Sequence, residues 1–119
     1  MSWGTVELEE EVRVWLERLP SDQFATSAFY IDLLAEHGVL LGEPYTKHLQ
    51  GKVRELRFHL DGQAVRISYW IAPGRRIILM TVFVKSRLRE NREVARALRS
   101  FAECVAAGHT ADEEDEGNV

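Results

Sequence analysis

Cysteine is almost absent from this sequence, because Cys104 stands alone among 119 residues. A single thiol cannot form a disulfide within the chain, so nothing in the sequence requires an oxidising compartment. No apolar run reaches the roughly 18–20 residues that cross a membrane. The first seven residues have neither a basic start nor an apolar signal core. We therefore expect a cytoplasmic protein with no membrane segment.

Motifs for the common cofactors are also missing. The sequence has no glycine-rich phosphate loop, no HExxH pair and no CxxC pair. The histidines at positions 37, 48, 59 and 109 are scattered, without the spacing of a metal site. No nucleophile elbow is present. We expect no metal and no cofactor.

Charge is distributed unevenly along the chain, although the net charge of the whole is only −4. Residues 1–46 carry a net charge of −7, residues 47–99 a net charge of +9, and residues 100–119 a net charge of −6. A strongly basic segment is typical of a surface that binds nucleic acid. A solvated basic face packed against acidic helices would give the same pattern. The basic segment is therefore where a functional site is expected.

Hydrophobic periodicity predicts a single α+β domain over residues 1–106. A short strand at residues 3–6 is followed by two acidic helices, one from residue 7 to Pro20 and one from residue 21 to Gly38. A loop at 39–51 leads to three strands at about 52–60, 63–71 and 76–84, and then to a helix at 90–106. The order βααβββα predicts a mainly antiparallel four-stranded sheet with helices on one face. The acidic segment 107–119 is expected to be a disordered tail.

The turns between the three later strands predict which residues face each other. Asp61-Gly62 is a strong signal for a two-residue hairpin loop, which places Arg57 opposite Arg66. A four-residue turn around Pro73 would then place Arg66 opposite Thr81. Because side chains alternate across a sheet, one face is predicted to be the apolar core: Leu56, Phe58, Leu60, Val65, Ile67, Tyr69, Ile71, Ile78, Met80, Val82 and Val84. The other face collects Glu55, Arg57, His59, Arg66, Ser68, Trp70, Thr81 and Phe83.

This second face is unusual for a surface in contact with solvent. Two arginines directly opposite each other repel, and an anion between them would convert the repulsion into a bidentate clamp suited to phosphate. Trp70 and Phe83 would supply flat surfaces on which a nucleobase can stack. The alternative is structural: Glu55 or Asp61 pairs with the arginines, and the aromatic rings pack beneath a loop.

Several short patterns follow one another in the basic segment. They are L-x-G-x-x-R-E-L-R at 49–57, R-I-x-Y-x-x-x-P-G-R-R-I at 66–77, V-F-V-K-S at 82–86 and R-E-V at 92–94. In this order they resemble the HigB-like toxins of the RelE/ParE superfamily, which are often phage-derived. The resemblance covers about residues 3–104 and leaves out the acidic tail.

The resemblance implies a RelE-like fold and a ribosome-dependent mRNA endonuclease, the toxin of a type II toxin–antitoxin pair. Such an enzyme works without metal, through attack of a 2′-hydroxyl on the adjacent phosphate. The partners it implies are mRNA on the ribosome and a small HigA-like helix-turn-helix antitoxin. Arg57, Arg66 and Phe83 match residues on the family's concave sheet face, and Lys85 matches the first lysine of its F-x-K-K run. Ser86 replaces the second lysine.

These matches define the candidate site. The residues expected to be catalytic are Arg57, Arg66, Lys85 and Phe83. The residues expected to bind RNA are Lys47, Lys52, Arg54, His59, Trp70, Arg87 and Arg89. The two arginines would stabilise the extra negative charge of a pentavalent phosphorane. Lys85 or His59 would carry the proton, because arginine stays protonated.

A second function on the same fold stays open at this point. A ParE-like protein that inhibits DNA gyrase, or an inactive toxin that acts only through partner binding, would have the same order of elements. The set of Arg57, Arg66, Phe83 and Lys85 favours the nuclease, because a gyrase inhibitor has no chemical need for it.

Overall fold

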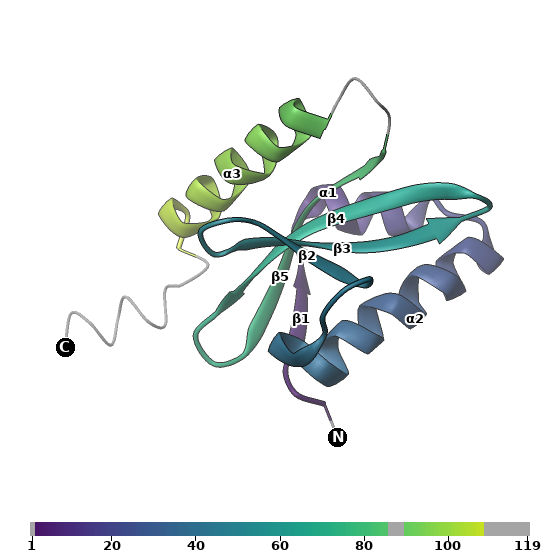
Figure 1. Cartoon of the computed structure of the whole chain (residues 1–119), viewed down its shortest axis with the longest axis horizontal. Helices are drawn as coiled ribbons and strands as arrows, with labels where there is room; N and C mark the ends of the chain where they lie inside the picture. The colour runs from purple at the N-terminus through teal and green to yellow at the C-terminus, as the bar shows by residue number, and fades with distance from the viewer. Residues whose placement is uncertain (1, 86–89, 109–119) are drawn as a thin grey trace.

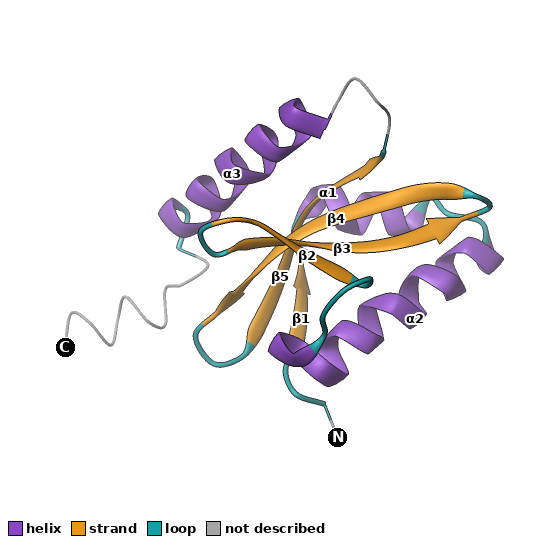
Figure 2. Ribbon diagram, viewed as in Figure 1, coloured by secondary structure: helices purple, strands orange, loops and turns teal. Residues whose placement is uncertain are grey.

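A computed structural model of the chain describes residues 2–85 and 90–108. The elements follow in the order β1 (Thr5–Leu8), α1 (Glu10–Glu17), α2 (Ser21–His37), the short 3-10 helix η1 (Gly38–Leu40), β2 (Thr46–Gln50), β3 (Val53–Leu60), β4 (Gln63–Ala72), β5 (Arg76–Val84) and α3 (Glu90–Ala106). Figures 1 and 2 show a twisted central sheet with the long helix α3 on one side and α1 and α2 on the other. The predicted α+β fold is confirmed.

The sheet has five strands in the order β1-β5-β4-β3-β2, one more than the sequence predicts. β1 runs parallel to β5, and all other neighbouring strands are antiparallel. The additional strand is β2, which lies in a segment predicted to be a loop. Its sequence is mostly polar and has no apolar alternation. It becomes a strand by pairing with β3 across a tight turn at Gly51, whose φ of 56° suits glycine.

The N-terminal region differs from the prediction by a few residues. β1 extends to Leu8, because Glu7 and Leu8 pair with Ile78 and Leu79 of β5. The backbone N–H of Glu9 also donates to the carbonyl oxygen of Leu79 at 2.9 Å. The first helix therefore begins only at Glu10, after the chain has left the sheet.

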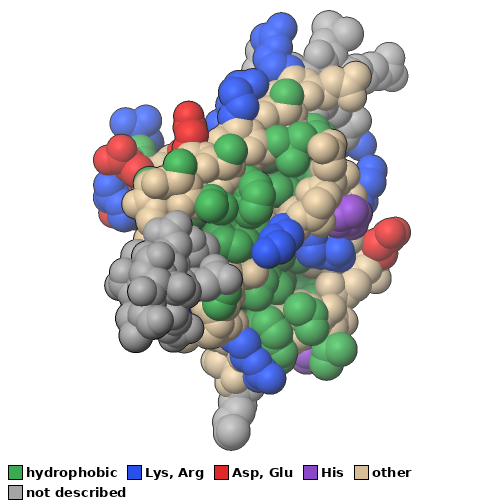
Figure 3. Space-filling model, turned by 90° about the vertical axis from the view of Figure 1, so that its left-hand side faces the viewer, with side chains coloured by type: hydrophobic (Ala, Val, Ile, Leu, Met, Phe, Trp, Pro, Cys, Tyr) green, Lys and Arg blue, Asp and Glu red, His purple; other side chains and the backbone are tan. Residues whose placement is uncertain are grey.

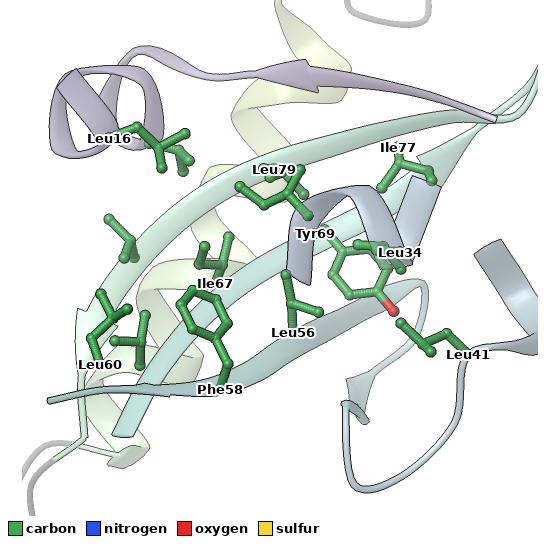
Figure 4. Close-up of a cluster of buried hydrophobic side chains, with 14 residues drawn as sticks. Leu16, Leu34, Leu41, Leu56, Phe58, Leu60, Ile67, Tyr69, Ile77 and Leu79 are labelled. Carbon is green, nitrogen blue, oxygen red and sulfur yellow. The ribbon is translucent and has the colours of Figure 1, made fainter. Parts of the chain in front are cut away.

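α1 and α2 cover one face of the sheet, and the larger apolar core lies between these two helices and the sheet (Figure 4). Leu16 of α1 and Leu34 of α2 belong to this core together with the sheet residues Leu56, Ile67 and Leu79. Burying side chains of this size contributes about 1.5–3 kcal/mol each. The predicted core residues of β3 and of most of β4 are confirmed, because all of them are buried in this cluster: Leu56, Phe58, Leu60, Val65, Ile67 and Tyr69.

The pairing of β4 with β5 differs from the prediction in two places. The turn has three residues, Pro73 to Arg75, because Ala72 pairs with Arg76, and Gly74 and Arg75 both have positive φ. A bulge then follows, since Ser68 pairs with Thr81 but Tyr69 pairs with Leu79. The shorter turn reverses, relative to the prediction, the faces to which residues 77–80 of β5 point, and the bulge restores the predicted faces from Thr81 onward.

The shorter turn has a direct consequence for the core. Ile78 and Met80 were expected beside Leu56, but they lie on the opposite face, and Ile77 and Leu79 take their place. Val84 was also expected in the core and is 42 % exposed at the end of β5. The expectations for Ile78 and Met80 are wrong because a one-residue shift in the turn moves the side chains that follow it to the other face. Val84 pairs with Val65 as a residue of the core face would, but it lies at the exposed end of the strand.

The helix α3 packs on the opposite face from α1 and α2, so the expectation that all helices share one face is wrong. Its apolar side chains contact Val53, Trp70, Ala72, Ile78 and Met80, which we call the covered half of this face. Trp70 is 2 % exposed, and its ring meets Phe101 of α3 edge to face at 4.9 Å. We call the charged and aromatic residues on the other part of this face the open half: Glu55, Arg57, His59, Arg66 and Phe83.

Arg96 ties α3 to the edge of β5. Its guanidinium Nη1 bonds to Glu11 of α1 at 2.6 Å, its Nε and Nη2 bond to Glu93, and Nη2 also donates to the carbonyl oxygen of Val82 at 3.2 Å. The Glu11 carboxylate in turn accepts the backbone N–H of Val82 at 2.9 Å. β1 does not extend as far as Val82, so side chains satisfy the backbone N–H and carbonyl groups of Val82 at this edge.

Within residues 2–85 and 90–108, no helix combines the length and the apolar character needed to span a bilayer.

Candidate functional site

The open half lies at the hairpin end of the sheet, where β3, β4 and β5 run side by side. Arg57 of β3 pairs with Arg66 of β4, as predicted. Arg66 pairs in turn with Phe83 of β5, and not with Thr81 as the four-residue turn would have required. The corrected register places a guanidinium pair and an aromatic ring in one row across three strands.

Glu55 lies beside both arginines. Its Oε2 is 3.4 Å from Nε of Arg57 and 3.7 Å from Nε of Arg66. The side chains of Glu55 and Arg66 are 8 % and 7 % exposed, whereas that of Arg57 is 24 % exposed. The structural alternative for the arginine pair is therefore confirmed for Glu55. Asp61 accepts a hydrogen bond from Gln23 instead.

The ion pairs leave an imbalance that suits an anion. One buried carboxylate neutralises one of two guanidinium charges, so the three groups together carry one positive charge. Arg57 turns Nε toward Glu55 and lines a surface pocket of about 410 Å³ together with His59 and Arg66. A phosphate that entered this pocket would meet the more exposed arginine first.

A second row of side chains lies next to the arginine row. His59 of β3 pairs with Ala64 of β4, and the backbone N–H of Lys85 donates to the carbonyl oxygen of Ala64 at 2.8 Å. Alternation places His59, Ala64 and Lys85 on the same face as Arg57 and Arg66. His59 and Lys85 are exposed. The small side chain of Ala64 leaves the space between them open.

Of two further predicted residues, Lys47 lies near the site, at the β2 side, whereas Lys52 lies at the end of β3 away from the Asp61-Gly62 hairpin. Lys47 pairs with Glu55 and lines a smaller pocket of about 150 Å³ together with Phe83 and Asn91 of α3. Lys52 is exposed in the turn between β2 and β3. Figure 3 views the end of the molecule that carries the β2–β3 and β4–β5 turns, away from the hairpin, and shows Lys and Arg side chains among exposed hydrophobic side chains there as well.

Besides Lys52, two other predicted RNA-binding residues are not brought to the site. Arg54 lies on the opposite face, where its guanidinium donates to the Thr46 hydroxyl at 3.3 Å beside Tyr69. Trp70 lies beneath α3, so the expectation that it stacks on a base is wrong. The two reasons differ. Strand parity directs Arg54 to the face that α1 and α2 cover, whereas Trp70 lies on the predicted face but is covered by α3. Arg87 and Arg89 lie outside the described residues, as does most of the predicted tail, from residue 109 onward.

A family model, that of the phage-derived protein Gp49-like family (DUF891), matches residues 14–102. The chain belongs to this family. Gp49-like proteins are a toxin-like family of toxin–antitoxin systems, and they are associated with RelE-like toxins that can be endoribonucleases. The toxin-like character implied by the sequence resemblance is therefore confirmed at the level of the family. No curated protein matches the chain significantly.

The Gp49-like match spans every described residue of the open half and most of α3, but not β1. It also includes three pocket residues that sequence reasoning missed: Tyr30 of α2, Pro44 and Tyr45. Tyr30 was not singled out because its helix was considered only as a packing element of the core. The loop before β2 carried no pattern that indicated a site. The Pro-Tyr pair within a loop was the only available signal for Tyr45.

Burial changes the acid–base behaviour of two groups outside the open half. The pKa of the Tyr69 hydroxyl is raised by burial, which outweighs the opposing effect of Arg54 and Thr46. The pKa of the Cys104 thiol is raised by burial; the nearby Trp70 side chain opposes this, and the Glu9 carboxylate at 3.6 Å adds to it. Among the described residues, no three His, Cys, Asp or Glu side chains lie together as metal ligands would.

Proposed function

We propose that this Gp49-like chain is the toxin of a type II toxin–antitoxin pair and cleaves mRNA on the ribosome, in the manner of HigB-like toxins. The observation that carries the proposal is the pair of adjacent rows on the open half. One row holds Arg57, Arg66 and Phe83, and the other holds His59 and Lys85 on either side of Ala64. Phosphate-binding groups and proton carriers therefore lie next to each other.

The chemistry follows from what each group can do. The 2′-hydroxyl of one nucleotide attacks the adjacent phosphorus, and His59 accepts the proton that the hydroxyl loses. The bond from phosphorus to the 5′-oxygen breaks, and the Lys85 ammonium donates a proton to that oxygen. The products are a 2′,3′-cyclic phosphate and a free 5′-hydroxyl. Arg57 and Arg66 stabilise the additional charge on the phosphorane oxygens.

The spacing of the two proton carriers supports this division of labour. Two strand separations of about 4.8 Å place the backbones of His59 and Lys85 about 10 Å apart. The base and the acid must lie on opposite sides of the phosphorus, because the entering and leaving oxygens are in line. Side chains that converge from this distance over Ala64 can meet those two oxygens. Phe83 would hold the flanking base by stacking.

The experiment is translation in vitro with mapping of mRNA 5′ ends, with ribosomes present and absent. The full chain should cut translated mRNA only when ribosomes are present. Arg57→Ala should lower cleavage about 100-fold or more, and Arg57→Lys should restore little, because lysine cannot form the planar fork. Arg99→Ala is the matched control, since Arg99 is exposed on α3 outside the open half. Circular dichroism establishes that each variant is folded.

Two results would contradict the nuclease. The first is unchanged cleavage by folded Arg57→Ala. The second is growth arrest by the parent without any cut in mRNA. If the parent then also inhibited supercoiling by DNA gyrase, the ParE-like alternative would replace it.

The partner proposed is a HigA-like helix-turn-helix antitoxin that presents acidic residues to the basic surface, because charge complementarity guides association. The reading frame next to the gene should encode it. The purified complex should show no mRNA cleavage in the same assay. Cleavage by the complex as fast as by the free chain would rule out this mode of inhibition.

A further inference from the structure

The edge of β3 is uncovered next to the arginine pair. The register of β2 with β3 ends at Thr46 and Leu56, so within the described part of the chain no strand adjoins residues 57–60 on that side. The chain before β2 turns away there, and the carbonyl oxygen of Tyr45 accepts the backbone N–H of Arg57 at 2.8 Å. Side chains from both faces of the sheet therefore meet around this edge.

The 410 Å³ pocket occupies this place and has two chemically different walls. One wall is polar and consists of the guanidinium groups of Arg57 and Arg66 and the imidazole of His59. The other is aromatic and consists of Tyr30, Tyr45 and Phe58. The volume lies within the roughly 300–1,000 Å³ of ordinary small-molecule sites. A ligand that satisfies both walls must be anionic at one end and flat and apolar at the other.

The three rings are not equivalent. Phe58 is 3 % exposed and stacks on Tyr30, with ring centroids 5.0 Å apart and planes 8° apart. Tyr45 is 40 % exposed, and its ring lies 6.4 Å from that of Tyr30 at an angle of 37°. The stacked pair supports the wall from behind. Tyr45 offers a ring surface to a ligand.

We propose that this pocket binds one unpaired nucleotide of the RNA strand, with its base stacked on Tyr45 and its phosphate on Arg57 and His59. The inference rests on the proposed function, because it assigns a nucleotide next to the cleaved bond to a site that shares Arg57 with the reaction. An aromatic ring accepts any base by stacking. The RNA strand then passes around the edge of β3, and only a single strand can make that passage.

The test measures binding of a short fluorescein-labelled RNA to the full chain by anisotropy, separately from cleavage. Two probes are used: an octamer of ordinary nucleotides with 2′-O-methyl groups to prevent cleavage, and the same backbone with abasic residues. Tyr45→Leu should weaken binding of the ordinary octamer about tenfold and leave the abasic probe unchanged. Tyr45→Phe and Tyr45→Trp should bind like the parent, because both keep a ring.

The variants separate the inference from the proposed function. Arg57→Ala should weaken binding of both probes, since it removes a phosphate contact. If folded Tyr45→Leu binds both probes like the parent, or loses both equally, the nucleotide pocket is wrong, whereas ribosome-dependent cleavage by the parent would still support the nuclease. If Tyr45→Trp binds the octamer much more weakly than the parent, the stacking role of Tyr45 is also overturned.

Discussion

The covered and the open half of the α3 face are built from the same strands but have opposite characters. In the covered half, Trp70, Ile78 and Met80 are almost fully buried beneath apolar side chains of α3. In the open half, two arginines and one glutamate form a charged cluster that α3 does not seal with apolar contacts. The bulge between Ser68 and Tyr69 lies at the boundary between the halves. On this face, β5 contributes Ile78 and Met80 to the covered half before the bulge and Phe83 to the open half after it.

The difference separates stability from function along a single face. Apolar burial is favourable without a ligand, so the covered half stabilises the packing of α3 whether or not a ligand is bound. Clustered guanidinium groups are costly until an anion or a carboxylate compensates them. Glu55 pairs with both arginines but neutralises only one of their two charges, which leaves one net positive charge for a phosphate. Substitutions in the two halves should therefore separate loss of folding from loss of activity.

The largest effect is expected in the covered half. Trp70→Ala should lower the free energy of unfolding by about 3–5 kcal/mol, because it removes a fully buried aromatic ring and leaves a cavity beneath α3. Trp70→Phe should cost less, because it retains a ring against Phe101. Urea denaturation followed by circular dichroism measures both. A loss below about 1 kcal/mol for Trp70→Ala would show that α3 does not depend on this contact.

The next effect tests whether the open half is held together by Glu55. Glu55→Ala should lower the free energy of unfolding by about 3 kcal/mol, because two partly buried guanidinium groups lose their carboxylate. Glu103→Ala, at an exposed position of α3, is the control and should change stability by less than about 0.5 kcal/mol. Equal, small changes in both variants would mean that water screens the charges of the open half.

The contrast between the halves also explains which parts were predictable from the sequence. The Arg57–Arg66 pair was predicted correctly, because Asp61-Gly62 fixes a two-residue hairpin whose register follows from local turn chemistry. The position of Phe83 opposite Arg66 was not, because it results from a three-residue turn and a bulge, each of which shifts the β4–β5 register by one residue without a clear signal in the sequence. Trp70 was misplaced because strand parity gives the face of a side chain but does not say which helix covers it.

The ion pair of Glu55 illustrates a similar limit. Alternation placed Glu55 on the same face as the arginines, but two interpretations, a salt bridge or an open anion site, fitted the same pattern. Only the distances from Oε2 to the two Nε atoms decide it. β2 escaped prediction because its residues are polar, and its pairing with β3 supplies what its sequence does not.

A smaller effect is expected where α3 is tied to the edge of β5. Arg96→Leu should cost about 1–2 kcal/mol, because it removes charge-assisted hydrogen bonds to Glu11 and Glu93 and uncovers the carbonyl of Val82. Arg99→Leu on the same helix is the matched control, since Arg99 is exposed. Both are measured by urea denaturation. A loss in Arg96→Leu no larger than that in Arg99→Leu would show that apolar packing alone positions α3.

The smallest effect concerns Cys104, which is 4 % exposed on the side of α3 that packs against the covered half. Burial, opposed by the Trp70 side chain and reinforced by the Glu9 carboxylate, holds the pKa of its thiol above the ordinary value of about 8.5. Above that pH the unfolded chain loses the thiol proton and the folded chain keeps it. The folded state then binds more protons than the unfolded state, so its stability falls as the pH rises.

The measurement compares the parent with Cys104→Ala by urea denaturation at pH 7, 8.5 and 9.5. Tyrosine and lysine titrations are common to both chains and cancel in the difference. The stability of the parent relative to the variant should therefore be constant up to about pH 8 and decline above it. Alkylation by iodoacetamide should in parallel be much slower for the folded parent than for the chain in urea, because the thiolate is the reactive form. A constant difference up to pH 9.5, together with rapid alkylation of the folded chain, would show that α3 opens often enough to give Cys104 the acidity of an exposed thiol.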